Sequence, residues 1–261
     1  MGKKILIGII LFFALVGLAF SAVWVAMQLG LLNVRGSIDE RNGFFGNVLG
    51  THSCEQCEWQ ATPEWATVRE GLRKDKEVLA RVSSETGVSA RLIAAVAVPE
   101  QLRFFTSERE VYKRVFEPLK ILGSLSQFSL GITGIKQATA EEVERRANSW
   151  QQQLIAYPAG IDRKQELYTR LTEPKDHYYS YLYTALYIRQ IMDEWASAGH
   201  PLGGKPGIVI TLFNIGFVNS EPKADPQVGG ADITIGGTTY TFGSLGESFY
   251  HSDELMDIFL R

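Results

Sequence analysis

The chain has few of the residues that build redox or metal centres. It contains only two cysteines in 261 residues, Cys54 and Cys57, and four histidines. In a cytosolic protein a C-x-x-C pair would indicate redox chemistry or half of a zinc site. No second ligand pair at matching spacing follows, and His52 alone does not supply one. The sequence therefore predicts no metal and no cofactor, and outside the cytoplasm a local disulfide is the interpretation that we favour.

An excess of basic charge is also missing. The formal net charge is -3, and charges of both signs are interspersed along the chain. A nucleic-acid-binding domain would show a basic stripe or patch. The only basic cluster is Lys3 and Lys4, which directly precedes an apolar run. We therefore expect no nucleic-acid partner.

Residues 5–32 contain no charged side chain at all. About 20 apolar residues in a helix are enough to span a bilayer. Because Lys3 and Lys4 precede the run, the positive-inside rule predicts a cytoplasmic N-terminus and an extracytoplasmic remainder. A cleaved signal peptide, with its cleavage site at residues 19–21, is the alternative. Since the apolar run continues well past that site, we favour an uncleaved single-pass anchor in a bacterial cell membrane, with the domain on the periplasmic or cell-wall side.

Residues 33–62 resemble a juxtamembrane linker, because they are rich in glycine, serine and asparagine and show no sustained period. From residue 63 onward the apolar residues recur mostly at helical spacing. The remaining length, residues 63–261, is enough for one well-buried domain. The sequence thus predicts an anchor (1–32), a linker (33–62) and one folded domain (63–261).

Local signals place the helices of this domain. Pro63 fits the first turn of a helical segment that ends at Gly87, and Ser89 can cap a second helix that is apolar nearly all round. Thr139 and Glu142 have the spacing of a capping box for a helix that runs to about residue 153. A further helical period covers residues 178–195.

The C-terminal part has a different pattern. Residues 207–213 form a short apolar run that fits either a helix or a strand. Residues 233–235 and 239–242 alternate around Gly236 and Gly237, which predicts a β-hairpin. Glycine and serine in residues 243–252 fit a loop over a cleft. The fold class is therefore mainly α, with a small C-terminal β-hairpin.

Glu100 is the acidic residue that the pattern singles out, because it follows the most apolar helix of the domain. The sequence predicts that this helix ends at Pro99 and Glu100, where the carboxyl is partly desolvated and faces the negative end of the helix dipole. Both effects disfavour the ionised form. A carboxyl that keeps its proton suits general-acid catalysis. The alternative is that Glu100 merely marks the exit of the helix into solvent.

Several segments resemble, in order, the motifs of a known enzyme family. Residues 92–96 lead to Glu100, residues 131–140 read GITGIKQATA, residues 185–188 read ALYI and residues 213–216 read FNIG. They resemble the L-I-x-A-v-x-x-E-S, S-x-G-L-M-Q-I-x-P-x-T-A, G-x-x-Y-L and A-Y-N-A-G segments of lytic transglycosylases in the lysozyme-like superfamily. Each segment alone is a weak signal for the family, whereas their ordered spacing along the chain is a stronger one.

The resemblance spans roughly residues 75–220 and implies a lysozyme-like domain that binds and cleaves peptidoglycan glycan strands. It implies that Glu100 alone is acid and base in breaking the β-1,4 bond between N-acetylmuramic acid and N-acetylglucosamine, with closure of a 1,6-anhydro ring. The positions that match substrate-contacting segments are Gln101, Ser129, Gly131, Ile132, Thr133, Gly134, Phe213 and Asn214.

The chain also departs from the family pattern. Gln101 replaces the usual Ser after the catalytic Glu, Thr133 and Gly134 replace Met-Gln, and residues 102–128 are inserted. We therefore expect a more open cleft at Gly134, with Gln101 or Gln137 making the missing amide contact. On this expectation Gly134→Gln would be tolerated or mildly beneficial.

Two other functions fit the same sequence. The missing amide at position 134 also suits a catalytically weak or inactive glycan-binding module of an envelope complex. A hydrolytic muramidase would need a second carboxylate near Glu100, for which Glu108 or Glu110 are available. The sequence indicates no particular protein partner.

Overall fold

The computed structural model describes residues 58–106, 129–216, 219 and 221–260. The predicted anchor, most of the predicted linker with Cys54 and Cys57, and both Glu108 and Glu110 lie outside these residues. In the part of the chain that is described, no helix is both long and apolar enough to cross a membrane.

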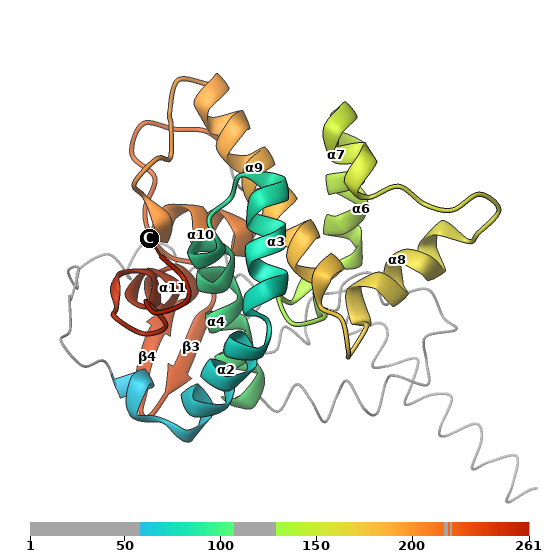
Figure 1. Ribbon diagram of the computed structural model, residues 1–261. Coiled ribbons are helices and arrows are strands. Elements are labelled where there is room, and N and C mark those ends of the chain that lie inside the picture. Colours follow the sequence, from blue (N-terminus) through green and yellow to red (C-terminus); the bar gives the residue numbers. More distant parts are fainter. Residues whose placement is uncertain (1–57, 107–128, 217–218, 220, 261) are drawn as a thin grey trace, which may run out of the picture. The chain divides into compact units, whose positions relative to one another are not determined.

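The described chain is mainly helical, with two small antiparallel sheets of two strands each (Figure 1). Its elements are η1 (Glu58–Ala61), α2 (Pro63–Lys74), α3 (Lys76–Thr86), α4 (Ala90–Thr106), β1 (Ser129–Leu130), β2 (Ile135–Lys136), α6 (Gln137–Arg146), α7 (Ser149–Leu154), α8 (Arg163–Thr172), α9 (Tyr178–Ser197), α10 (Pro206–Ile215), β3 (Asp232–Ile235), β4 (Thr238–Thr241) and α11 (Phe242–His251).

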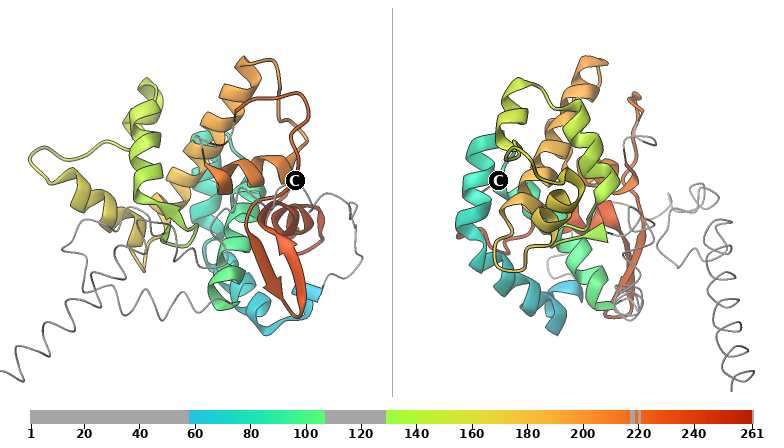
Figure 2. Two further views of the ribbon diagram at one scale, coloured as in Figure 1. Left: turned by 180° about the vertical axis from the view of Figure 1, so that it is seen from behind. Right: turned by 90° about the vertical axis from the view of Figure 1, so that its right-hand side faces the viewer.

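Helix α4 lies at the centre of the folded domain. It contacts α2, α3, α9, α10, α11 and β3, and residues 93–98 are fully buried. Figures 1 and 2 show α2 and α3 on one side of it and the β3–β4 hairpin with α11 on another. A helix without a polar face is stable only when it is covered all round. The predicted buried helix is thus confirmed.

The end of α4 was predicted wrongly. The helix does not stop at Pro99 and Glu100 but continues to Thr106 with Pro99 inside it. Proline has no N–H to donate to the Ala95 carbonyl, which normally ends or kinks a helix. Here Gly246 of α11 comes so close that a Cβ on it would lie 2.5 Å from that carbonyl oxygen. Glu100 therefore lies inside a helix and not at its negative end.

The N-terminal helices begin and end largely where the local signals predict. Thr62 caps α2 by accepting from the Trp65 N–H at 3.2 Å, and Ser89 Oγ accepts from Leu92 N–H at 3.2 Å. Gly87 ends α3 in the left-handed conformation, with φ of 72°. However, the segment divides into two helices at Asp75.

The predicted linker runs too far toward the domain. Trp59 of η1 is fully buried. The centre of its ring lies 4.8 Å from that of Trp65, in an edge-on arrangement, and 6.5 Å from that of Phe249. Its indole N–H donates to Ser248 Oγ at 3.1 Å. Residues 58–62 therefore belong to the folded domain.

Three further predictions have different outcomes. The β-hairpin is confirmed, because β3 and β4 pair in antiparallel register around Gly236 and Gly237. The helix expected from Thr139 is broken, since α6 ends at Arg146 and the capping box belongs to Asn148 and Gln151 at the start of α7. Residues 243–252 are not a loop; most of them form α11.

Candidate functional site

Glu100 lies on the second half of α4, beside Arg103 one turn later. An Arg103 Nη2 hydrogen is donated to Glu100 Oε2, and both side chains are only 12% exposed. Residues three apart face the same side of a helix, so α4 itself brings the two together. The sequence pattern did not single out Arg103, although this spacing was readable from it.

A tight hairpin covers the other side of Glu100. Strands β1 and β2 pair Leu130 with Ile135, and Gly131 and Gly134 both have φ of 64° in the turn between them. A Cβ at Gly134 would overlap Cγ, Cδ and Oε1 of Glu100. The carboxyl of Glu100 therefore lies directly against the Gly134 backbone.

This contact corrects the expectation for position 134. The space that a side chain would enter there is not an open part of a cleft, because the carboxyl of Glu100 occupies it. A Gln at this position would also have to adopt a left-handed backbone. The expectation that Gly134→Gln is tolerated or beneficial is therefore wrong.

The two glutamines expected to replace the missing amide have partners within the protein. Gln101 is half-buried and donates its side-chain N–H to the carbonyl oxygen of Ile132 in the hairpin turn. Gln137 Nε2 donates to Glu141 Oε1 at 3.3 Å. Gln101 thus links α4 to the turn that contains Gly134. This hydrogen bond keeps the turn next to the Glu100 carboxyl.

The remaining residues of the turn have mixed roles. Thr133 is fully buried, and its hydroxyl lies 3.1 Å from Ser180 Oγ and donates to the Ser180 carbonyl at 3.3 Å. Ile132 is partly buried against the core. Gly131 is close to Ser180, since a Cβ there would lie 2.7 Å from its Oγ. The backbone of Ser129 is in β1, but the described structure does not include its side chain.

Asn214 and Phe213 lie at the end of α10. Asn214 Oδ1 accepts from the Ala231 N–H at 2.9 Å, and Phe213 is buried with its ring 5.3 Å from the Tyr187 ring. Phe213 is therefore a core residue, and the Asn214 side chain fixes the backbone before β3.

A short series of contacts links Asn214 to Glu100. The Phe242 N–H donates to the Ala231 carbonyl at 2.8 Å, and Ala231 in turn binds Asn214. The guanidinium carbon of Arg103 lies 6.0 Å from the centre of the Phe242 ring. Segments that are far apart in the sequence thus lie close together around α4.

Glu144 is another carboxylate with low exposure, and it has clear structural partners. Glu144 accepts from the hydroxyls of Tyr183, at 2.6 Å, and Tyr157, and from Arg163 at 3.2 Å. Burial and the Glu144 hydrogen bond raise the pKa of Tyr157 to about 12. This cluster joins α6, α8 and α9.

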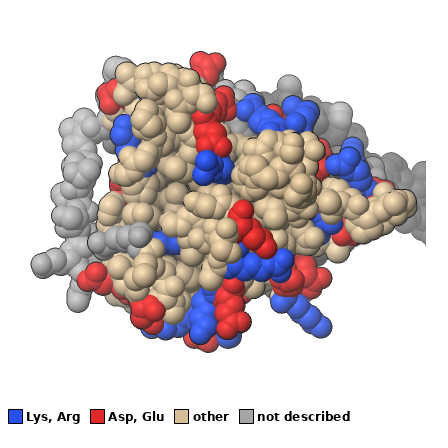
Figure 3. Space-filling model, turned by 45° about the horizontal axis from the view of Figure 1, so that its top comes forward, with Lys and Arg blue, Asp and Glu red and all other residues tan. Residues whose placement is uncertain are grey.

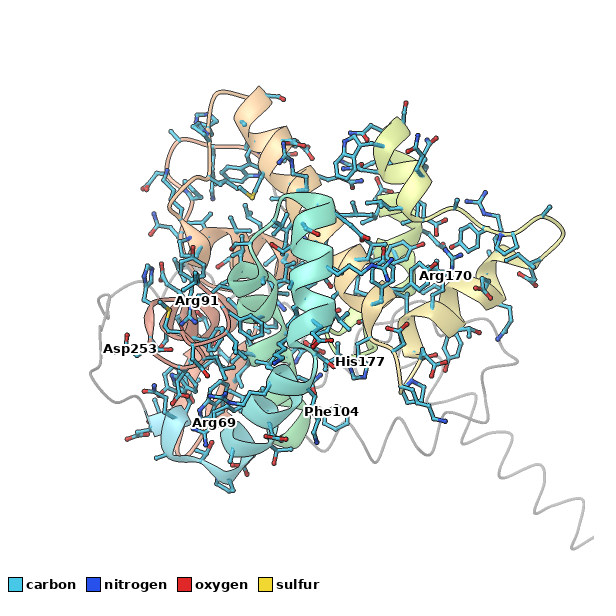
Figure 4. The ribbon with its side chains drawn as sticks, in the orientation of Figure 1. Arg69, Arg91, Phe104, Arg170, His177 and Asp253 are labelled. Atoms are coloured by element: carbon cyan, nitrogen blue, oxygen red, sulfur yellow. The ribbon has the colours of Figure 1, made fainter. Side chains whose placement is uncertain are left out.

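Asp75 plays a similar part at the junction of α2 and α3. Its Oδ2 binds His177 Nδ1 at 2.7 Å and the Tyr181 hydroxyl at 2.8 Å. The hydrogen bond to Asp75 raises the pKa of His177, against the opposing effect of burial. Figure 4 labels His177, which lies just before α9. The sequence pattern singled out neither cluster, because their members are far apart in the chain.

Two cavities of the described domain lie away from Glu100. One, of about 430 Å³, is lined by residues that include Trp195, Leu212, Ile215 and Lys223, and the other, of about 200 Å³, lies near Gly87 and Leu202. Within the described ranges no group of three potential ligands could hold a metal ion. On the face in Figure 3, charges of both signs are mixed.

The chemistry available at Glu100 is proton transfer by one carboxyl group. One oxygen of this carboxyl binds the Arg103 guanidinium, the other lies against the Gly134 backbone, and the amide of the next residue, Gln101, binds the same turn.

Compared with known proteins, the chain matches no family model, and neither curated proteins nor solved structures show a significant match.

Proposed function

We propose that the chain is a peptidoglycan lytic transglycosylase with a lysozyme-like domain and Glu100 as its single acid and base. The observation that carries the proposal is the contact between Glu100 on α4 and Gly134 in the β1–β2 turn. These residues belong to the first and second segments that resemble the family motifs. A second observation that supports the proposal is the position of Asn214, from the last of these segments. Asn214 binds Ala231, Ala231 binds Phe242, and the Phe242 ring lies near Arg103.

The proposed reaction needs two proton transfers. Glu100 first protonates the oxygen that links N-acetylmuramic acid to N-acetylglucosamine, and the bond from this oxygen to the muramic anomeric carbon breaks. The neighbouring acetamido group stabilises the cationic sugar, as in substrate-assisted glycosidases. The Glu100 carboxylate then takes the proton of the 6-hydroxyl, whose oxygen bonds to the anomeric carbon. The carboxyl is regenerated, and no water is consumed.

Location is part of the proposal. Residues 5–32 would anchor the chain in the bacterial cell membrane and leave the domain outside the cytoplasm, within reach of the wall. Protease added to intact spheroplasts should then digest the domain and leave a small membrane fragment. A full-length chain that stays protected would refute this topology.

A non-catalytic glycan-binding module is the second candidate. The observation in its favour is that Glu100 is only 12% exposed and is paired with Arg103, so a substrate has little access to its carboxyl. Such a module would bind the wall without releasing soluble products.

The deciding experiment incubates the full-length chain with purified sacculi and identifies soluble products by mass spectrometry. We expect 1,6-anhydro-muropeptides from the wild type and none from Glu100→Gln, because an amide cannot transfer the proton. Glu70→Gln is the control, since Glu70 is exposed on α2. Reducing ends in place of anhydro ends would indicate a muramidase. Binding to sacculi without any product would indicate the glycan-binding module.

A further inference from the structure

We propose that Arg103 and Gly134 form a clamp that fixes the rotamer of Glu100 for the second proton transfer, in which Glu100 is the carboxylate base. This inference rests on the proposed function and assigns Arg103 as a positioning residue. Arg103 lies outside the segments that resemble the family motifs, so the resemblance does not point to it.

The two carboxyl oxygens of Glu100 face different partners. Oε2 accepts the hydrogen from Arg103 Nη2, whereas Oε1 and Cδ fill the space next to Gly134. A long acidic side chain has several rotamers in solution, so ordering it costs free energy that contacts in the folded protein must offset. Here an ion pair holds one edge and backbone packing holds the opposite edge.

Both partners are placed to keep the clamp in one geometry. Arg103 is as little exposed as Glu100, at 12%, and its guanidinium lies 6.0 Å from the Phe242 ring. Gly134 is in the left-handed region, and the Gln101 amide binds the Ile132 carbonyl in the same turn. The turn is thereby tied to the helix that carries Glu100. A misplacement of about 1 Å can reduce catalysis by about 100-fold.

The first test substitutes Arg103 in the full-length chain and measures kcat and KM with a soluble peptidoglycan fragment. Arg103→Gln should lower kcat by about 10- to 100-fold with little change in KM, because substrate still binds but the carboxyl is no longer fixed. Arg103→Lys, which keeps the charge, should recover most of the lost kcat. A purely structural role would not produce this split or this recovery.

The second test compares two glycines that both lie in the left-handed backbone region. A Cβ on Gly134 would push the Glu100 carboxyl aside, whereas a Cβ on Gly160 would meet nothing within 4 Å. Both have positive φ, 64° and 81°. Gly134→Ala should therefore lose kcat about 10-fold or more while Gly160→Ala keeps it. This pair also decides the matter if Arg103→Gln does not fold.

The outcomes separate the clamp from the proposed function. If the wild type releases no product, the proposed function fails and the clamp fails with it. If the wild type is active, Glu100→Gln is inactive and the folded variants Arg103→Gln and Gly134→Ala keep wild-type kcat, the clamp alone is overturned. A loss of kcat in Gly160→Ala equal to that in Gly134→Ala would also overturn it, because strain alone would then explain the loss.

Discussion

Arg91 Nη2 donates to the carbonyl oxygen of Phe249 at 2.7 Å, and the guanidinium carbon of Arg91 lies 4.8 Å from the centre of the Phe249 ring. The Arg91 side chain is fully buried. Its other N–H groups donate to carbonyls of Tyr250, Ser252, Glu254 and Phe259. One residue of α4 thus holds α11 and the segment after it; Figure 4 labels Arg91 there.

Arg91→Met should lower the free energy of unfolding by about 3 kcal/mol or more, because five buried or partly buried carbonyls lose their donor together. The measurement is urea unfolding of the full-length chain. Arg189→Met is the control; Arg189 is 43% exposed in its pair with Asp193 and should change stability by about 0.5 kcal/mol or less. Equal effects of the two substitutions would contradict the anchoring role of Arg91.

Gly246→Ala and Gly71→Ala should have opposite effects on stability. A Cβ on Gly246 would lie 2.5 Å from the Ala95 carbonyl oxygen and 2.9 Å from Ile210, so α11 would have to move from α4, at a cost of about 1–3 kcal/mol. Gly71 lies within α2 with nothing within 4 Å, so alanine should stabilise by about 0.5–1 kcal/mol. Thermal unfolding of both variants measures the two shifts. A stabilising Gly246→Ala would show that the close approach is not needed.

The His177–Asp75 pair should make stability depend on pH. Because the folded-state pKa of His177 is raised above the ordinary value of 6.5, its contribution is complete below about pH 6.5 and is lost as pH rises through the folded pKa. The stability difference between wild type and His177→Gln should therefore shrink from about pH 5.5 to about pH 8.5. Urea unfolding across this range is the measurement.

Asp75→Asn provides the control for that pH series. It removes the carboxylate that binds His177 while leaving an acceptor oxygen for the Tyr181 hydroxyl. In this background the pH-dependent difference from substituting His177 should be much smaller, because only the charges of Asp176 and Glu173 then still raise the His177 pKa. A difference that keeps its full pH dependence would show that Asp75 is not the main cause.

Local sequence signals were sufficient for much of the helical architecture. Thr62 and Ser89 cap their helices, Gly87 ends α3, and Gly236 and Gly237 form the turn of the β3–β4 hairpin. Each of these signals acts between residues that are at most a few positions apart, so these caps and turns form without contacts to distant parts of the chain. The choice of Glu100 also came from the sequence, through the apolar run before it and the ordered motifs.

Only the tertiary structure decided what surrounds Glu100 and where α4 ends. The helix passes through Pro99, with Gly246 of α11 packed beside the Ala95 carbonyl. Gly134 proved to be the residue that leaves room for the Glu100 carboxyl, and Arg91 the anchor of the C-terminal segment. These relationships join residues far apart in the chain. Their energies come from packing and desolvation, which exist only once the segments have met.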